Sequence, residues 1–378
     1  MPSLQILREF AKRLGVSADY LATGASSQEG MSSDFLEAEV ALRLGDEERA
    51  AELYEAARDD ADSPAALARA QLGLGQLALR RGDTSRGTAW LEEALDSGSL
   101  SAGDASIAAS ALGPSYAAQS RFDECFALFE RFLEDARSRG DHFDHVRFAL
   151  LLANAYVDHG DFARAHATIG EVLDLARETV DPMLRAGLYW SQSRVHLSQG
   201  NPDRAAEYAQ LAMVTLRASE QTLEAARALL LLAYIENDRG NSRAALDLVD
   251  EGEPVMVAAG ETTDVAMFTI ERARALSALG EGDKAAELLL GIVPRVRAAA
   301  PRDAARAYSA IASVFQEQGD HERALELYEL AVQQAPLANK YVAEALTAMA
   351  EIYEDRGDTQ KALEFLKQAL AARTGATA

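Results

Sequence analysis

Apolar and small residues follow a repeating order along this chain: two helical segments separated by a short polar break. Residues 148–172 show the unit most clearly, with an apolar helical segment, a break at Gly160 and Asp161, and a second helical segment. Small residues lie seven positions before the break, at Ala153, and five positions after it, at Ala165. Because small side chains let two antiparallel helices approach closely, this order predicts a helical hairpin.

The same hairpin pattern occurs nine times, with a period of 37–40 residues. The nine breaks fall at Gly45, Gly82, Ser120, Gly160, Gly200, Gly240, Gly280, Gly319 and Gly357. At every break the residue seven positions before and the residue five positions after are small. Nine positions after the break lie mostly larger apolar residues, with Ala209 as the exception. Glycine can end the first helix in the left-handed conformation, and Asp or Asn beside it can cap the second.

The eighth hairpin shows a second spacing. In Gly319-Asp-His-Glu-Arg-Ala-Leu-Glu-Leu-Tyr328 a small residue is followed four positions later by an aromatic one. This spacing resembles the tetratricopeptide repeat (TPR), and the resemblance covers residues 34–372. It implies an all-α fold, a right-handed TPR superhelix (α-solenoid) of about nine helix-turn-helix hairpins. In such an array the first helices line a concave groove, and each hairpin buries its apolar face only against its neighbours.

Two features of the array carry specific expectations. We expect Pro114 to kink the first helix of the third hairpin and Pro254 to shorten the second helix of the sixth. At the C-terminal end, Leu363, Leu366 and Leu370 recur at helical spacing, and most of them are expected to face the core. No further polar helix covers this end, so a homodimer contact there is one interpretation.

Residues 1–24 depart from the repeat. Ser3 can cap a helix over residues 4–14, and Ser17 can cap a second short helix that ends near Gly24. The string Pro-Ser-Leu…Leu…Phe-Ala…Leu-Gly-Val-Ser…Asp-Tyr-Leu…Thr-Gly looks like the last two helices of a lambda-repressor-like (Xre-family) helix-turn-helix domain. The expected order is therefore a truncated helix-turn-helix domain over 1–24, a polar linker over 25–33, and a TPR array over 34–378.

In the Xre family the turn and the recognition helix lie before this segment, so no base-reading residue can be assigned. Two interpretations stay open. The protein starts upstream of Met1 with a complete helix-turn-helix domain, which we favour, or residues 1–24 are a remnant that packs on the first hairpin. Contact with DNA is expected only through the completed domain.

Charge and composition narrow the choice of partner. The net charge of −23 argues against nucleic-acid binding by the array itself, because cationic contacts supply most of that affinity. There is no run of about 18 apolar residues and no signal peptide, so we expect a cytoplasmic protein with no membrane span. The single cysteine, Cys125, excludes an internal disulfide, and it occupies a small packing position.

The sequence offers few candidates for metal-binding, phosphate-binding or catalytic residues. His142 and His145 lie three residues apart without further metal-ligand spacing, and a solvated helix start is the better interpretation. Gly280-Glu-Gly-Asp-Lys284 lacks the spacing of a phosphate-binding loop, and no nucleophile elbow appears. We therefore expect no enzyme activity, no metal and no cofactor.

The first helices carry the candidate binding residues. Arginines occur thirteen positions before several breaks, and a mixed polar and aromatic set occurs six positions before, on the same helix face. The predicted peptide- or partner-binding groove consists of Arg147, Asn154, Trp190, Arg194, Arg227, Tyr234, Arg274 and Arg306. Arg69 shares the first of these positions. The alternative is that some of these arginines pair with Asp or Glu of the next hairpin.

The TPR resemblance implies that Asn154 bonds the backbone of an extended peptide, as Asn does at this position in peptide-clamping TPR domains. Together with the Xre-like segment, it implies the sensory part of a cytoplasmic bacterial transcriptional regulator that resembles peptide-pheromone receptors. The alternative is a TPR scaffold or adaptor that mediates protein–protein interactions without binding DNA.

Overall fold

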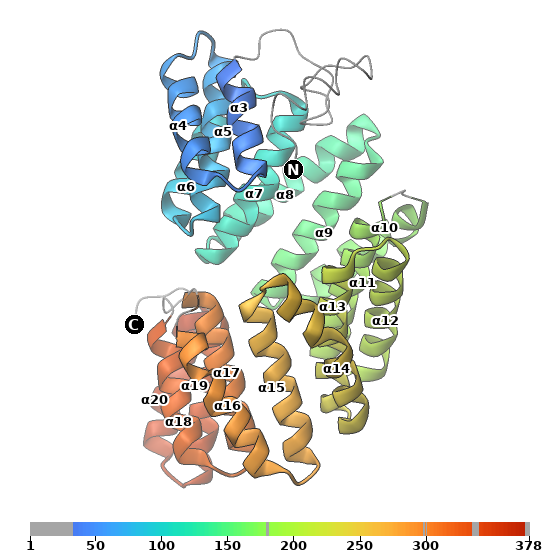
Figure 1. The fold of residues 1–378 in the computed structure, drawn as a ribbon, viewed down its shortest axis with the longest axis vertical. Helices are drawn as coiled ribbons and strands as arrows, with labels where there is room; N and C mark the ends of the chain where they lie inside the picture. The colour runs from blue at the N-terminus through green and yellow to red at the C-terminus, as the bar shows by residue number, and fades with distance from the viewer. Residues whose placement is uncertain (1–32, 179–180, 298, 300, 335–339, 375–378) are drawn as a thin grey trace. The chain divides into compact units, whose positions relative to one another are not determined.

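The computed structural model describes residues 33–178, 181–297, 299, 301–334 and 340–374. In these ranges the chain is helical, without a strand, and helices follow one another in hairpins (Figure 1). The predicted all-α architecture of repeated hairpins is confirmed. The Xre-like segment and nearly all of the predicted linker lie outside the described residues.

The helices divide between two compact units. One unit comprises Met1–Ala117 with Asp123–Phe132, and the other comprises Ala118–Phe122 with Leu133–Ala378. Helices of the first unit are α3 (Ser33–Arg43), α4 (Glu47–Asp59), α5 (Pro64–Arg80), α6 (Thr84–Asp96) and α7 (Ala102–Ala118), which ends one residue beyond it. Helix α8 (Phe122–Arg139) contributes residues to both units.

The second unit contains six further hairpins. Its helices are α9 (His142–His159), α10 (Phe162–Glu178), α11 (Pro182–Ser198), α12 (Pro202–Ala218), α13 (Thr222–Asp238), α14 (Ser242–Ala259), α15 (Thr262–Ala278), α16 (Gly282–Arg297), α17 (Pro301–Glu317), α18 (His321–Gln334), α19 (Lys340–Asp355) and α20 (Thr359–Thr374). Odd-numbered members are the first helices of their hairpins: α9 packs on α10, and each later one packs on the helix before it and the helix after it.

Positive φ angles mark the turn between the two helices of each hairpin. All nine predicted break residues have positive φ, including Ser120 at 59°. At the fourth hairpin, the amide of Gly160 donates to Tyr156 and Val157, and the amide of Asp161 donates to Tyr156. These bonds satisfy carbonyls that the end of a helix leaves open, and the left-handed residue makes them reachable.

The small residues lie where the two helices of a hairpin cross. Ala153 and Ala165 are both fully buried. In the third hairpin, a Cβ atom on Gly113 would lie 2.0 Å from Cζ of Phe129, so the two helices touch through the missing side chain. Gly75 has the same relation to Leu91, at 2.7 Å from Cγ. The hairpins are therefore held together by ring or branched side chains seated on small residues.

Two sequence expectations are wrong. Helix α14 runs through Pro254 from Ser242 to Ala259, so this proline does not shorten it. Pro254 lies in the thirteenth position of the helix, and the preceding turns tolerate the lost hydrogen bond without ending it. Leu363, Leu366 and Leu370 do not face the core: they are 52%, 45% and 64% exposed. No described helix is long and apolar enough to cross a membrane.

Candidate functional site

The predicted groove residues lie on consecutive first helices of the second unit. We call this set the first-helix face: Arg147 and Asn154 on α9, Trp190 and Arg194 on α11, Arg227 and Tyr234 on α13, Arg274 on α15 and Arg306 on α17. Tyr234 is 38% exposed, and the other members are half-buried. Trp190 packs against the core cluster that includes Tyr189 and Leu229.

Asn154 is held in one orientation by the next hairpin. The hydroxyl of Ser191, itself 1% exposed, donates to Oδ1 of Asn154 at 2.6 Å. This bond occupies the acceptor side of the amide. The donor side, Nδ2, has no hydrogen-bond partner among the described residues. The arrangement leaves a preoriented amide donor on the first-helix face, which is the geometry that a backbone carbonyl of a ligand requires.

Most of the arginines on this face already have carboxylate partners. Arg194 Nη2 lies 3.0 Å from Asp158 Oδ1 on the preceding first helix. Arg227 contacts Asp264 at 2.9 Å, Glu224 at 2.6 Å and Glu261 at 3.7 Å. Burial alone would lower the pKa of Arg227, but the carboxylates around it outweigh burial and raise the pKa.

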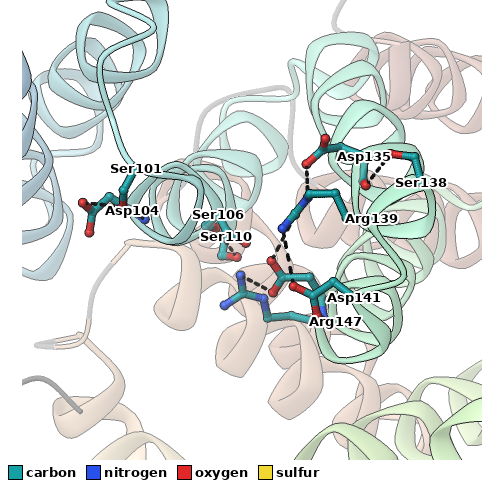
Figure 2. A network of polar contacts seen from close by, with 10 residues as sticks. Ser101, Asp104, Ser106, Ser110, Asp135, Ser138, Arg139, Asp141 and Arg147 are labelled. Carbon is teal, nitrogen blue, oxygen red and sulfur yellow. Dashed lines mark hydrogen bonds and ion pairs between the residues drawn. The ribbon is translucent and has the colours of Figure 1, made fainter. Parts of the chain in front are cut away.

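Arg147 belongs to a group of charges at the start of α9. Its Nη2 lies 2.8 Å from Oδ1 of Asp144, one turn earlier on the same helix. Arg139 joins this group through Asp144 at 3.9 Å and Asp141 at 3.6 Å, and it also pairs with Asp135 of its own helix at 3.0 Å (Figure 2). In the first unit, Arg69 pairs with Asp104 of the next hairpin at 3.0 Å.

These pairs follow the repeat. Asp104, Asp144, Glu224 and Asp264 all lie sixteen positions before a break, in the first turn of a first helix. A carboxylate there is favoured by the positive end of the helix dipole, and it meets an arginine of its own or the preceding hairpin. The pairs of Asp104 with Arg69 and of Asp264 with Arg227 join successive hairpins and stabilise their stacking, which is the alternative that the sequence left open. The pairs of Asp144 and Glu224 lie within one helix. Arg306 differs, because no ion pair joins it to a carboxylate in the described part of the chain.

A buried acid on this face was missed by sequence reasoning. Glu271 on α15 is 3% exposed, and Nη1 of Arg274 lies 3.3 Å from its Oε2. Nδ2 of Asn237 donates to Glu271 from the preceding first helix, and the guanidinium of Arg274 lies 5.0 Å from the centroid of the Tyr234 ring. Burial raises the pKa of Glu271, and Arg274 offsets part of that rise. The sequence did contain an indication of this buried acid, because the same position, nine residues before the break, is apolar or small in the neighbouring hairpins.

The two histidines at the start of α9 show no metal-binding arrangement. Within the described ranges, no group of three or more His, Cys, Asp and Glu side chains could hold a metal ion. Burial, followed by the charges of Arg137 and His142, lowers the pKa of His145.

Comparison with known proteins identifies the repeat. Residues 68–375 match the family described as the MalT-like TPR region. No curated protein matches the sequence. Among solved structures, the apo form of the quorum sensor NprR from B. thuringiensis is 15% identical, with a TM-score of 0.65, over 87% of this chain and 92% of that chain. A Rap protein complexed with competence and sporulation factor is 14% identical, with a TM-score of 0.64, over 88% and 94% of the two chains.

The Rap conjugation gene regulator of plasmid pLS20, in complex with the Phr* peptide, is 14% identical, with a TM-score of 0.56, over 99% of this chain and 94% of that chain. At these identities the similarity establishes the fold alone. The family match spans more than half of the sequence and agrees with the observed hairpins. This chain therefore belongs to the MalT-like TPR family.

Proposed function

We propose that this chain is the sensory, protein-interaction region of a cytoplasmic bacterial transcriptional regulator, and that it binds an extended peptide along the first-helix face. The observation that carries the proposal is the Asn154 amide, which Ser191 orients so that Nδ2 can donate outward. An extended peptide offers a regular row of backbone carbonyls to such a donor. The pLS20 regulator, whose structure is a complex with a peptide, supports this use of the fold.

The arginines of the first-helix face differ in whether they already form an ion pair within the protein. Arg306 is the arginine best placed to meet a ligand carboxylate, whereas Arg147, Arg194, Arg227 and Arg274 would have to exchange an internal partner for the ligand. Tyr234, which is 38% exposed, adds an aromatic ring beside Arg274. The proposal includes no catalytic step, no metal and no cofactor.

Regulation would follow from differential affinity. A peptide that binds one arrangement of the hairpins better than another shifts the population toward that arrangement. DNA binding would require a helix-turn-helix domain completed upstream of Met1. The alternative function is a TPR scaffold that binds folded proteins and does not contact DNA.

The peptide proposal is tested with an isosteric change. A peptide is first selected from a mixture of short random peptides on the full chain, labelled, and titrated by fluorescence anisotropy. Asn154→Asp keeps an acceptor for Ser191 but replaces the outward donor with an acceptor. We expect about a tenfold loss of affinity, the size of one hydrogen bond lost and a repulsive oxygen gained.

Two further variants make this result specific. Asn201→Asp changes an exposed amide before α12 that makes no side-chain cap bond, and it should leave affinity unchanged. Ser191→Ala releases the amide of Asn154 and should weaken binding by a smaller factor. Equal affinity of the wild type and Asn154→Asp, or selection of no peptide at all, would contradict peptide binding at this face.

The regulator and scaffold interpretations differ in the protein's N-terminus. The intact mass of the protein isolated from its own cells distinguishes them. A mass above 40.6 kDa by roughly 4–6 kDa, the size of a missing half-domain, supports the DNA-binding regulator. A mass equal to that of the chain favours the scaffold.

A further inference from the structure

Two histidines, a glutamine and a tyrosine lie together where the fourth hairpin meets the fifth. His166 belongs to α10, Gln192 and His196 lie one turn apart on α11, and Tyr208 belongs to α12. The rings of His166 and His196 meet edge to face, with centroids 5.9 Å apart. His196 stacks on Tyr208, with centroids 5.4 Å apart and an angle of 14° between the planes. We call these four residues the imidazole cluster; through it, α11 contacts both α10 and α12.

Two buried polar atoms of the imidazole cluster lack a hydrogen bond. Nε2 of Gln192 lies 2.8 Å from Nδ1 of His166, and because an amide nitrogen only donates, this ring nitrogen accepts and carries no proton. Oε1 of Gln192 and Nδ1 of His196 are buried without a hydrogen-bond partner among the described residues. An imidazolium would place a charged N–H donor at Nδ1 of His196, where no acceptor is bonded. Burial of such a donor costs more than burial of the neutral ring.

The groups that face His196 come from three helices. His166 lies on α10, and Arg204 and Glu207 lie on the first turns of α12. From α9, Asp158 reaches α11 but is already ion-paired there at 3.0 Å. Burial, followed by the charges of His166 and Arg204, lowers the pKa of His196, and Glu207 opposes this effect. The surroundings therefore favour the neutral imidazole.

Helix α11 links the imidazole cluster to the first-helix face. Ser191, whose hydroxyl orients Asn154, directly precedes Gln192 in the chain. Arg194, another member of the first-helix face, lies between Gln192 and His196. A change in how α11 packs on its neighbours is therefore transmitted to the residues that this helix presents on the first-helix face.

We propose that the imidazole cluster is a pH-sensitive joint that holds α11 against α10 and α12. At neutral pH the ring of His196 is uncharged and the joint is closed. As the pH falls, protonation puts a charge and an unbonded donor into this contact, and the packing of α11 loosens. The stabilising contribution of His196 is fully present above its ordinary pKa of 6.5 and is lost as the pH falls through the lowered pKa of the folded state. The joint does not depend on peptide binding.

Histidine resonances identify the group that titrates. The full chain, which has six histidines, is labelled with ¹³C at histidine Cε1 and followed by NMR as the pH is lowered. We expect one resonance to titrate below pH 6.5 and to be absent in His196→Phe. The phenylalanine keeps an aromatic ring against Tyr208 but cannot be protonated. A His196 resonance that titrates at or above pH 6.5 overturns the proposal.

Hydrogen exchange measured by mass spectrometry tests whether protonation loosens α11. Between about pH 7.5 and about pH 5, after correction for intrinsic exchange rates, opening of α11 and α12 in the wild type should rise about tenfold for each unit by which the pKa of His196 is lowered. This rise should disappear in His196→Phe. The matched control is His142→Phe, which changes an exposed histidine of α9 and should keep the rise.

His196→Asn also removes the titrating ring and replaces His196→Phe in the comparison if the phenylalanine variant does not fold. An equal rise in the wild type and in the His196 variant overturns the proposal, as does a wild type without any rise. Stronger protection of α11 at about pH 5 overturns it too, because protonated His196 would then bond to Oε1 of Gln192 and tighten the contact.

Discussion

Nδ2 of Asn237 donates to both the backbone carbonyl and the carboxylate of Glu271, each at 2.9 Å. This pair joins two successive first helices at a point where Glu271 has almost no contact with solvent. Arg274 supplies the nearest positive charge, at 3.3 Å. Burial raises the pKa of Glu271 above its ordinary value of 4.5. The contribution of Glu271 to the free energy of unfolding therefore changes with pH.

We predict that Glu271 makes the protein less stable as pH rises. The folded state holds the proton more tightly than the unfolded state, so between the unfolded and the raised folded pKa the folded chain binds more protons. Its contribution is therefore largest below the unfolded pKa of Glu271 and is lost as pH rises through the folded pKa. Urea unfolding from about pH 7 toward about pH 5 should show wild type gaining stability relative to Glu271→Gln.

The control is Glu351→Gln, an exposed acid on α19, whose difference from wild type should not follow this trend. If the wild type instead loses stability relative to Glu271→Gln as pH falls, the attraction of Arg274 outweighs burial. The pKa of Glu271 would then be lowered rather than raised.

The hairpin turns could be predicted because they depend on neighbouring residues. A positive φ is local, and glycine adopts it with little strain, so the spacing of glycines places the turns. At Ser120 the position in the repeat overrides the backbone preference of the residue: the serine adopts a φ of 59°, whereas the other eight breaks have glycine. Small residues such as Gly113 were equally informative, because only they fit where two helices cross.

The partners of the charged residues could not be predicted in this way. Which carboxylate an arginine meets depends on how one hairpin is offset from the next, as with Arg194 and Asp158, 36 residues apart. The repeat register places Asn154 and Arg194 on successive first helices, where the structure has them, but the sequence does not reveal which polar atoms are already bonded. The exposure of Leu366 was missed as well: its position in the repeat predicts burial, but the side chain is 45% exposed.

Gly113→Ala should destabilise the first unit. The added Cβ atom would lie 2.0 Å from Cζ of Phe129, whose ring is 1% exposed and has little room to move. We expect a loss of about 1–3 kcal/mol of unfolding free energy, typical of overpacking, despite the better helix propensity of alanine. Gly170→Ala is the matched control, because nothing lies within 4 Å of its Cβ position in α10.

The control should gain roughly 0.5–1 kcal/mol, since alanine replaces an exposed glycine inside a helix. Phe129→Leu in the Gly113→Ala background should recover part of the lost stability by shortening the ring. Equal stability of Gly113→Ala and wild type in chemical denaturation would mean that the two helices can separate at this crossing.

Tyr308 and Tyr328 should respond in opposite ways to replacement by phenylalanine. The hydroxyl of Tyr308 is buried in α17 without a hydrogen-bond partner among the residues that the structure describes, whereas the hydroxyl of Tyr328 in α18 donates to Oε1 of Gln316 at 2.8 Å. Tyr308→Phe removes an unsatisfied polar group and should leave stability unchanged or raise it by about 1 kcal/mol. Tyr328→Phe breaks a bond and should cost roughly 0.5–1.5 kcal/mol. Both variants keep the aromatic ring, so thermal and urea unfolding measure the effect of the hydroxyl alone. An equal loss of stability in Tyr308→Phe and Tyr328→Phe would show that the Tyr308 hydroxyl is hydrogen-bonded in solution.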